Sequence, residues 1–200
     1  MAHISPDCAR KAASQESEDQ IIAAYSRLVQ SRGIDNITIR EICREAKVSN
    51  GCFYHHFSTK NDVMRAWYIQ FTKDVALKIK ASGAETPEEQ IAIYFEGYAE
   101  LNTGLGVSFC RHFYTADNSF LGSHDHESLD VIYGIVVRFL EKEGLSERYT
   151  PENIVRYFLI ISRGVMFEWG VKEGGFDAMA KMRALVRIAI DSVKTGIYDL

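Results

Sequence analysis

The chain has 200 residues, of which 46% are hydrophobic, enough apolar material for one or two globular domains with a substantial core. This composition excludes a disordered chain and a small disulfide-stapled one. The net charge of −4 is unevenly distributed: residues 1–80 carry 12 Lys/Arg against 9 Asp/Glu, whereas residues 81–200 carry 11 against 18. We therefore expect only the N-terminal part to attract polyanions such as nucleic acids.

Prolines, glycines and apolar spacing predict an all-α fold. Pro87 and Pro151 each follow a threonine and precede acids, the order expected where a helix begins. Gly33 and Gly144 stand where helices are expected to end. About nine helices are predicted, two of them within residues 38–57 and the others at about residues 18–32, 60–81, 87–102, 107–114, 124–143, 151–172 and 176–197.

The order of the predicted helices indicates that the chain is divided into three parts. Residues 1–16 are expected to form a disordered tail, and residues 17–63 a three-helix N-terminal domain. Residues 64–200 are expected to form a larger helical C-terminal domain.

Residues 37–60 predict two short helices joined by a sharp turn. Thr38 and Glu41 have the spacing of a capping box at the start of the first helix, which continues to Ala46. Ser49 caps a second helix only three residues after Ala46, a link that leaves room only for a corner between packed helices. The segment therefore predicts a helix-turn-helix.

The second of these helices has one apolar and one polar side. Val48, Phe53 and Phe57 supply the apolar side. The polar side has no acidic residue and consists of Asn50, Gly51, Cys52, Tyr54, His55 and His56. Because a helix that enters a DNA groove must keep carboxylates away from the phosphates, this side predicts a DNA-binding surface.

The pattern Val48-Ser49-x-Gly51-x-Phe53-Tyr54-x-His56-Phe57, followed by Lys60, resembles the DNA-binding domain of TetR-type transcriptional regulators. The resemblance implies a nine-helix subunit, a homodimer through the last two helices, and a C-terminal small-molecule pocket that controls operator binding. Most such proteins are repressors, so a repressor released from its operator by an effector is expected. An activator and a ligand-independent regulator remain open alternatives.

The resemblance also implies roles at the DNA, where phosphate contacts fix the register and base contacts read the sequence. The residues expected at phosphates are Thr38, Tyr54, His55 and Lys60, with Ser49 and Lys47 as further candidates. Those expected toward base edges are Arg40, Asn50, Gly51 and Cys52. Arginine can form two hydrogen bonds with guanine, and asparagine can do the same with adenine. Glycine lets the helix backbone approach the bases closely. His56 faces either the DNA or the neighbouring helix.

Two residues depart from the family pattern. Lys47 stands at the turn position where glycine is usual, and a left-handed lysine costs on the order of 1 kcal/mol. Cys52 stands where threonine or alanine is common, which favours a thymine methyl as its partner. A redox role for Cys52 and the ordinary packing of a small side chain are both open.

The two C-terminal helices are long and unusually apolar. Positions such as Ile160, Phe167 and Ile188 widen their apolar faces, which a two-fold dimer through a four-helix bundle would cover. A thick intramolecular core is the alternative, because periodicity does not separate the two. The residues expected at the dimer interface are Ile154, Val155, Phe158, Leu159, Ile161, Ser162, Val165, Met182, Leu185, Val186, Ala189, Ile190 and Val193.

Aromatic and a few polar residues of the C-terminal domain are candidates for an effector pocket, although most of the aromatics are expected in the core. The candidate set is Trp67, Phe71, Phe95, Tyr98, Phe109, Arg111, His112, Phe113, Tyr133, Arg163, Phe167, Glu168 and Trp169. A salt bridge is the alternative for Arg163 and Glu168, because an isolated charge within an apolar helix is costly.

No metal, cofactor or enzyme activity is predicted. The Cys110-x-His112 and His124-x-His126 spacings point side chains to different sides of a helix, and no nucleophile elbow, phosphate loop or HExxH motif is present. A helical enzyme and a protein-interaction module are the alternatives from other classes.

The four cysteines lack CxxC spacing, which favours reduced thiols in the cytoplasm. No apolar run has the length of a signal peptide or a membrane span. The expected location is therefore cytoplasmic. The expected partners are operator DNA, a second copy of the chain and an unidentified small-molecule effector, with no membrane.

Overall fold

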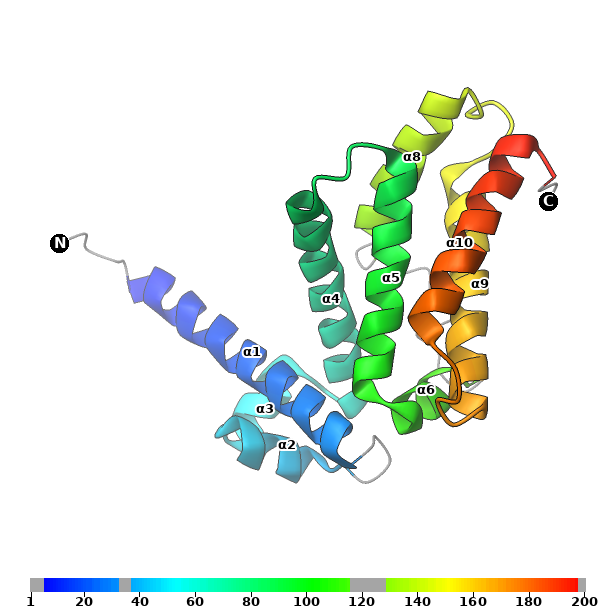
Figure 1. Ribbon diagram of the computed structural model, residues 1–200. Helices are drawn as coiled ribbons and strands as arrows, with labels where there is room; N and C mark the ends of the chain where they lie inside the picture. The colour runs from blue at the N-terminus through cyan, green and yellow to red at the C-terminus, as the bar shows by residue number, and fades with distance from the viewer. Residues whose placement is uncertain (1–5, 33–36, 116–128, 198–200) are drawn as a thin grey trace. The chain divides into compact units, whose positions relative to one another are not determined.

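The computed structural model describes residues 6–32, 37–115 and 129–197, and these residues form helices and connecting segments without strands (Figure 1). The predicted all-α fold is confirmed. The helices are α1 (Pro6–Arg32), α2 (Ile39–Ala46), α3 (Asn50–His56), α4 (Lys60–Ser82), α5 (Pro87–Leu105), α6 (Val107–Phe113), α8 (Asp130–Glu143), α9 (Pro151–Val171) and α10 (Ala178–Thr195). The helix start predicted at His124 lies outside the described residues.

The first helix begins earlier than its apolar pattern predicts. α1 starts at Pro6 rather than near Glu18, so the described residues 6–16 are helical and are not the expected tail. Proline suits the first position of a helix, and the alanine-rich segment that follows has a high helix propensity. Extending an existing helix costs little. Apolar periodicity misses this extension because it does not depend on an apolar stripe.

The chain divides into two compact units, Met1–Tyr68 and Ile69–Leu200. The division falls inside α4, slightly after the expected boundary. In the first unit, α1 packs against α2 and α3. Its apolar core is formed by Ile21, Ala24, Tyr25, Leu28, Val29, Ile37, Ile42, Ala46, Phe53, Phe57, Val63 and Met64.

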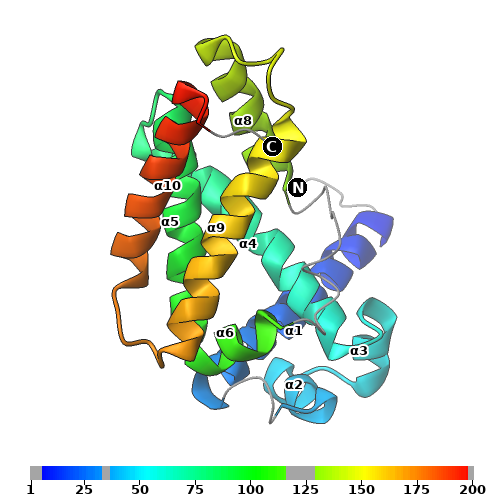
Figure 2. The same cartoon turned by 90° about the vertical axis from the view of Figure 1, so that its right-hand side faces the viewer.

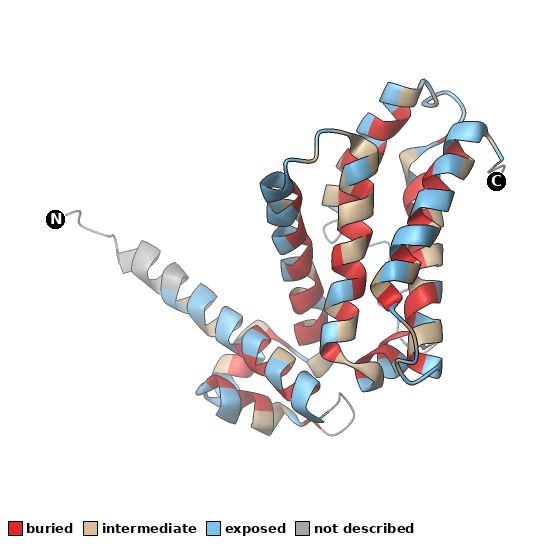
Figure 3. Ribbon diagram, viewed as in Figure 1, coloured by how far each residue is buried: buried red, intermediate tan, exposed pale blue. Residues whose placement is uncertain are grey.

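The second unit is organised around α5, which packs against α6, α8, α9 and α10. In Figure 3, buried red segments alternate with tan and pale-blue ones along α5. Aromatic rings fill this core: the Phe95 and Phe158 ring centroids lie 5.6 Å apart, and those of Phe109 and Phe113 lie 5.0 Å apart. Within the described part of the chain, no helix is long and apolar enough to cross a membrane.

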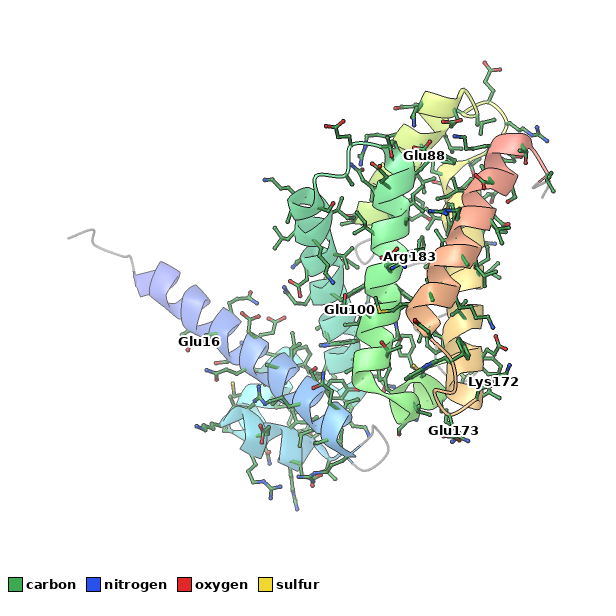
Figure 4. The ribbon with its side chains drawn as sticks, viewed as in Figure 1. Glu16, Glu88, Glu100, Lys172, Glu173 and Arg183 are labelled. Carbon is green, nitrogen blue, oxygen red and sulfur yellow. The ribbon has the colours of Figure 1, made fainter. Side chains whose placement is uncertain are left out.

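Charged residues join the ends of α5, α8 and α10. Glu88, labelled at the start of α5 in Figure 4, accepts hydrogen bonds from Lys142 Nζ at 2.8 Å and Lys194 Nζ at 3.3 Å. Glu143 Oε2 lies 3.3 Å from Lys194 Nζ. Burial alone would raise the pKa of the Glu88 carboxyl, but the hydrogen bonds from the lysines prevail and lower the pKa to about 2. The ionised carboxylate therefore stabilises this end of the unit.

We expect Glu88→Gln to lower the free energy of unfolding at pH 7 by about 1 kcal/mol. Because the pKa of Glu88 is lowered from 4.5 to about 2 in the folded chain, its contribution is present above 4.5 and is lost as the pH falls toward 2. Urea unfolding followed by circular dichroism should show a smaller difference between parent and variant at about pH 3 than at neutral pH. Equal differences at both pH values would contradict this assignment, and Glu147→Gln, at an exposed position, is the control.

Candidate nucleic-acid interface

α2 begins with the predicted capping box. Thr38 N donates to Glu41 Oε2 at 2.9 Å, and Glu41 N donates to Thr38 Oγ1 at 3.3 Å. The backbone hydrogen bond from Thr38 is the largest cause that lowers the pKa of Glu41. The Thr38 hydroxyl also donates to Glu41 Oε2 at 2.9 Å. A phosphate contact by this hydroxyl would therefore have to replace an existing hydrogen bond.

The turn after α2 is left-handed at Lys47, which has φ 58° and ψ 36°. The Lys47 N–H donates to Arg44 O at 3.3 Å, and the Val48 N–H donates to Cys43 O at 3.0 Å, so the last carbonyls of α2 are satisfied. A side chain in this conformation costs on the order of 1 kcal/mol compared with glycine. The Lys47 side chain is exposed.

α3 is fixed by a cap at its start and an aromatic anchor in its middle. Cys52 N donates to Ser49 Oγ at 3.1 Å. Phe53 is fully buried, and its ring centroid lies 5.9 Å from that of Phe57. Because one side of α3 is held in the core, the orientation of its other side is determined.

The outward side of α3 is exposed and carries no carboxylate; its residues are Asn50, Gly51, Tyr54 and His55. Cys52 is half-buried beside them. A Cβ added to Gly51 would meet only Ser49 Oγ, at 3.7 Å, so the fold does not require glycine there. The missing side chain instead leaves room for another molecule to approach closely.

The first unit also carries basic residues outside α3. Arg40 on α2 is exposed, and Lys60 at the start of α4 is half-buried. The carboxylate of Glu45 lies 2.9 Å from Arg27 Nε, and Glu41 Oε1 lies 2.8 Å from an Arg32 guanidinium nitrogen. These ion pairs neutralise the two acids of α2 and so reduce repulsion of a polyanion.

His56 does not share the exposed side of α3. Its side chain is only 8% exposed, and its Nδ1 lies 3.7 Å from Glu18 Oε2 on α1. Of the two orientations left open by the sequence, the structure has the one toward the neighbouring helix. We therefore remove His56 from the set of DNA contacts. Its position three residues after the buried Phe53 places it on the same side of the helix.

Lys47→Gly is expected to stabilise the first unit and weaken DNA binding. Removing the strained side chain should raise the free energy of unfolding by about 0.5–1 kcal/mol. If Lys47 contacts a phosphate, the slope of log affinity against log salt should become less steep by about 1. Thermal unfolding and DNA titrations over a salt series measure the two effects. An unchanged salt slope would exclude Lys47 from the phosphate contacts.

Five predicted effector residues, Phe71, Phe95, Tyr98, Phe109 and Phe113, are buried in the second unit. Tyr98 connects the aromatic interior to a buried polar cluster, because Tyr114 OH lies 2.7 Å from Tyr98 OH and 2.8 Å from Asn102 Oδ1. Sequence reasoning missed Asn102 and Tyr114. The available signal was an amide four residues after Tyr98, on the same side of a largely apolar helix.

Two predicted effector residues form ion pairs at the surface instead. Arg111 lies 2.6 Å from Glu173, with both side chains more than half exposed. Glu168 pairs with Lys172 at 2.8 Å and also with Lys181. The hydrogen bond from Lys172 is the largest cause that lowers the pKa of Glu168, to about 2. Glu168 therefore forms the salt bridge that was expected as the alternative to a role in effector binding.

The remaining effector candidates are distributed over both units. Trp67 is buried in the first unit rather than in the C-terminal one. Phe167 is 55% exposed on α9, and His112 is exposed on α6. The half-buried members of the set are Tyr133, Arg163 and Trp169. The structure thus does not bring all thirteen candidates to one place.

Most residues predicted at the dimer interface lie in the subunit's own core, where α5, α6 and α8 pack against α9 and α10. The buried ones are Ile154, Val155, Phe158, Leu159, Ser162, Val165, Met182, Val186, Ala189, Ile190 and Val193. Only Ile161 and Leu185 of the predicted set are half-exposed. Packing within one subunit is therefore sufficient to bury these residues. Other large apolar residues of the same two helices stay exposed, namely Ile160, Phe167, Val171 and Ile188.

Cys43 and Cys110 are buried free thiols, and Cys52 is half-buried. Burial raises the pKa of the Cys110 thiol to about 12. His124 and His126 lie outside the described residues. Among the residues that are described, no three His, Cys, Asp or Glu side chains gather as a metal site would require.

The family model for bacterial regulatory proteins of the tetR family matches residues 21–67, which include α2, α3 and the turn between them. Over these residues the chain matches the tetR family. The family and the relatives described next are regulatory proteins and not enzymes.

A curated regulator and two solved structures are also similar to this chain. The HTH-type transcriptional regulator HbdR from Aromatoleum sp. (strain CIB) is 42% identical over 50 residues, which cover 25% of this chain and only 22% of that protein. FadR from Thermus thermophilus, in complex with lauroyl-CoA, has a TM-score of 0.64 at 21% identity, covering 92% of this chain and 96% of that one. FadR from Bacillus subtilis, in complex with stearoyl-CoA, has a TM-score of 0.61 at 18% identity, covering 90% and 99%. These solved structures share the fold.

Proposed function

We propose that this chain is a homodimeric transcriptional repressor of the TetR type in which each copy places α3 in the major groove of a two-fold symmetric operator. The observation that carries the proposal is the exposed, acid-free outward side of α3, held by the Ser49 cap and the buried Phe53. An α-helix fits the major groove of B-DNA. Asn50 then reads adenine and Arg40 reads guanine, while lysines, Tyr54 and His55 bind phosphates.

A small-molecule effector in the second unit is proposed to release the operator. Two features support this role: the aromatic interior around Tyr98, and the acyl-CoA bound to two regulators of similar fold. A long-chain acyl thioester has an apolar body that suits such an interior. The effector would favour a conformer with lower operator affinity, and linkage requires the operator to weaken effector binding by the same factor.

The DNA-binding role is tested by titrating the full chain with a duplex enriched from a random-sequence pool and with an unselected duplex. We expect the enriched duplex to bind at least about 1,000-fold more tightly, and its log affinity to fall steeply with log salt, by about 0.9 per neutralised phosphate. Equal affinity for both duplexes would contradict the proposal.

The effector role is tested separately by adding lauroyl-CoA to the complex of the chain with the enriched duplex. Release of the duplex, together with a rise in the unfolding temperature of the DNA-free chain, is the expected result. Retention of the duplex with no thermal shift would contradict an acyl-CoA effector and leave the DNA-binding role intact.

A further inference from the structure

The helix-turn-helix carries a free thiol on each of its two helices. Cys43 on α2 is buried, with 4% of its surface exposed, and Cys52 on α3 is half-buried. Packing alone explains a single buried cysteine, because such residues are usually inert. One accessible and one buried thiol side by side are different, since the first can be oxidised from solvent and the second can then attack it.

Hydrogen bonds at the turn connect the backbones of the two cysteines. The Val48 N–H donates to Cys43 O at 3.0 Å, so the chain folds back onto α2 at Cys43. Ser49 follows directly, and its Oγ accepts from Cys52 N at 3.1 Å, which places Cys52 in the first turn of α3. α2 and α3 pack against each other, as Figure 2 shows. The two cysteines therefore lie on adjacent helices of one compact unit.

The charge that Cys52 carries when it ionises acts on Cys43. Burial is the largest cause that raises the pKa of the Cys43 thiol, a hydrogen bond to its backbone lowers it, and the Cys52 thiolate raises it further. Because salt screens charges near the surface over about 10 Å, this effect indicates that the two sulfurs are neighbours. The raised pKa keeps Cys43 as a thiol, which leaves the more accessible Cys52 as the first to be oxidised.

We propose that Cys43 and Cys52 form a disulfide when the chain meets a peroxide, and that this link weakens operator binding. In the first step, the Cys52 sulfur attacks hydrogen peroxide: an S–O bond forms, the O–O bond breaks, and one water leaves. In the second step, the Cys43 sulfur attacks the Cys52 sulfenic acid: an S–S bond forms, and a second water leaves. The two thiols lose two electrons and two protons, which reduce the peroxide to two waters.

The effect on DNA rests on the proposed function, in which Cys52 lies toward the base edges. In the disulfide, the Cys52 sulfur is bonded to a buried residue of α2 and no longer contacts a thymine methyl. The link also fixes the first turn of α3 to α2, so α3 cannot adjust its position in the groove independently. Loss of one base contact in each half-site lowers the operator affinity on the order of 10-fold or more.

Peptide mapping by mass spectrometry tests the link in the full chain after treatment with hydrogen peroxide. Trypsin cuts after Arg44 and Lys47, so Cys43 and Cys52 fall in separate peptides. We expect these two peptides to be recovered as one linked pair, which dithiothreitol separates. The untreated chain should give the two peptides with free thiols.

Cysteine variants provide the controls for this mapping. Cys52→Ala and Cys43→Ala should each abolish the linked pair, so the test stays decisive if one of them folds poorly. Cys110→Ala should keep the pair, because Cys110 is a buried thiol of the second unit. Recovery of free Cys43 and Cys52 thiols after treatment, or their linkage to Cys8 or Cys110 instead, would overturn the inference.

Anisotropy titration with the enriched duplex measures the consequence for DNA binding. We expect the oxidised parent and oxidised Cys110→Ala to bind on the order of 10-fold more weakly than their reduced forms, and dithiothreitol to restore the affinity. Cys52→Ala should bind equally before and after treatment. A linked pair that leaves the affinity unchanged, or an equal loss in Cys52→Ala, would overturn the inference. Absence of specific binding by the reduced parent rejects the proposed function, whereas the mapped peptides still decide on the link.

Discussion

Asn50→Asp is expected to lower the affinity for the operator duplex on the order of 100-fold while leaving the chain as stable as the parent. Asn50 is the exposed first residue of α3. A carboxylate in the first turn of a helix interacts favourably with the helix dipole, so the substitution does not harm α3 itself. The same carboxylate lacks the amide donor needed for adenine and is repelled by the phosphates.

Fluorescence anisotropy titration with the enriched duplex measures this effect, and thermal unfolding measures the stability. Gln30→Glu is the matched control, because it makes the same change of charge at an exposed position of α1. We expect the control to change the affinity only slightly. An Asn50→Asp variant that binds as tightly as Gln30→Glu would mean that α3 does not face the bases.

Phe53→Ala is expected to produce the largest loss of stability, about 3–5 kcal/mol, because it empties the centre of the helix-turn-helix core. Phe53 is fully buried, and its ring lies against Phe57. The second unit has a core of its own, so the destabilisation should be confined to the first unit. Hydrogen exchange should accelerate in peptides from α1 to α3 and stay unchanged in those from α5 and α9.

The neighbouring residue provides the control for this prediction. Tyr54 is 60% exposed, so Tyr54→Ala should change stability by less than about 0.5 kcal/mol while still weakening DNA binding. Equal exchange rates for the two variants would show that Phe53 is not the anchor of α3. A large loss of stability in Tyr54→Ala would show that the outward side of α3 is packed rather than free.

Local signals in the sequence are sufficient to predict the helix boundaries that depend on neighbouring residues. Thr38 and Ser49 cap α2 and α3 as their spacing indicates. Thr86 and Thr150 cap the helices that begin with proline. Each of these signals acts over three or four residues, so tertiary packing is not needed to recognise it. The start of α1 is the exception, because that extension depends on helix propensity and not on an apolar stripe.

Features that depend on packing between distant segments could not be predicted in the same way. Apolar periodicity marks Phe158 and Met182 as buried, but it does not distinguish a subunit's own core from a dimer interface. The orientation of His56 depends on Glu18, which lies on another helix. Likewise, the cluster of Tyr98 with Tyr114 forms only when α5 and the segment after α6 are packed together.

Selection of bound duplexes from a random-sequence pool by the full chain is the most direct test of operator recognition by α3, because the recovered sequences report specificity, symmetry and spacing together. We expect an inverted repeat whose half-sites are separated by about one helical turn of DNA or a multiple of it. We also expect Asn50→Asp, used in a parallel selection, to lose preference at one position of each half-site. Recovery of sequences with no shared motif, or of the same motif by both proteins, would contradict the reading of bases by α3.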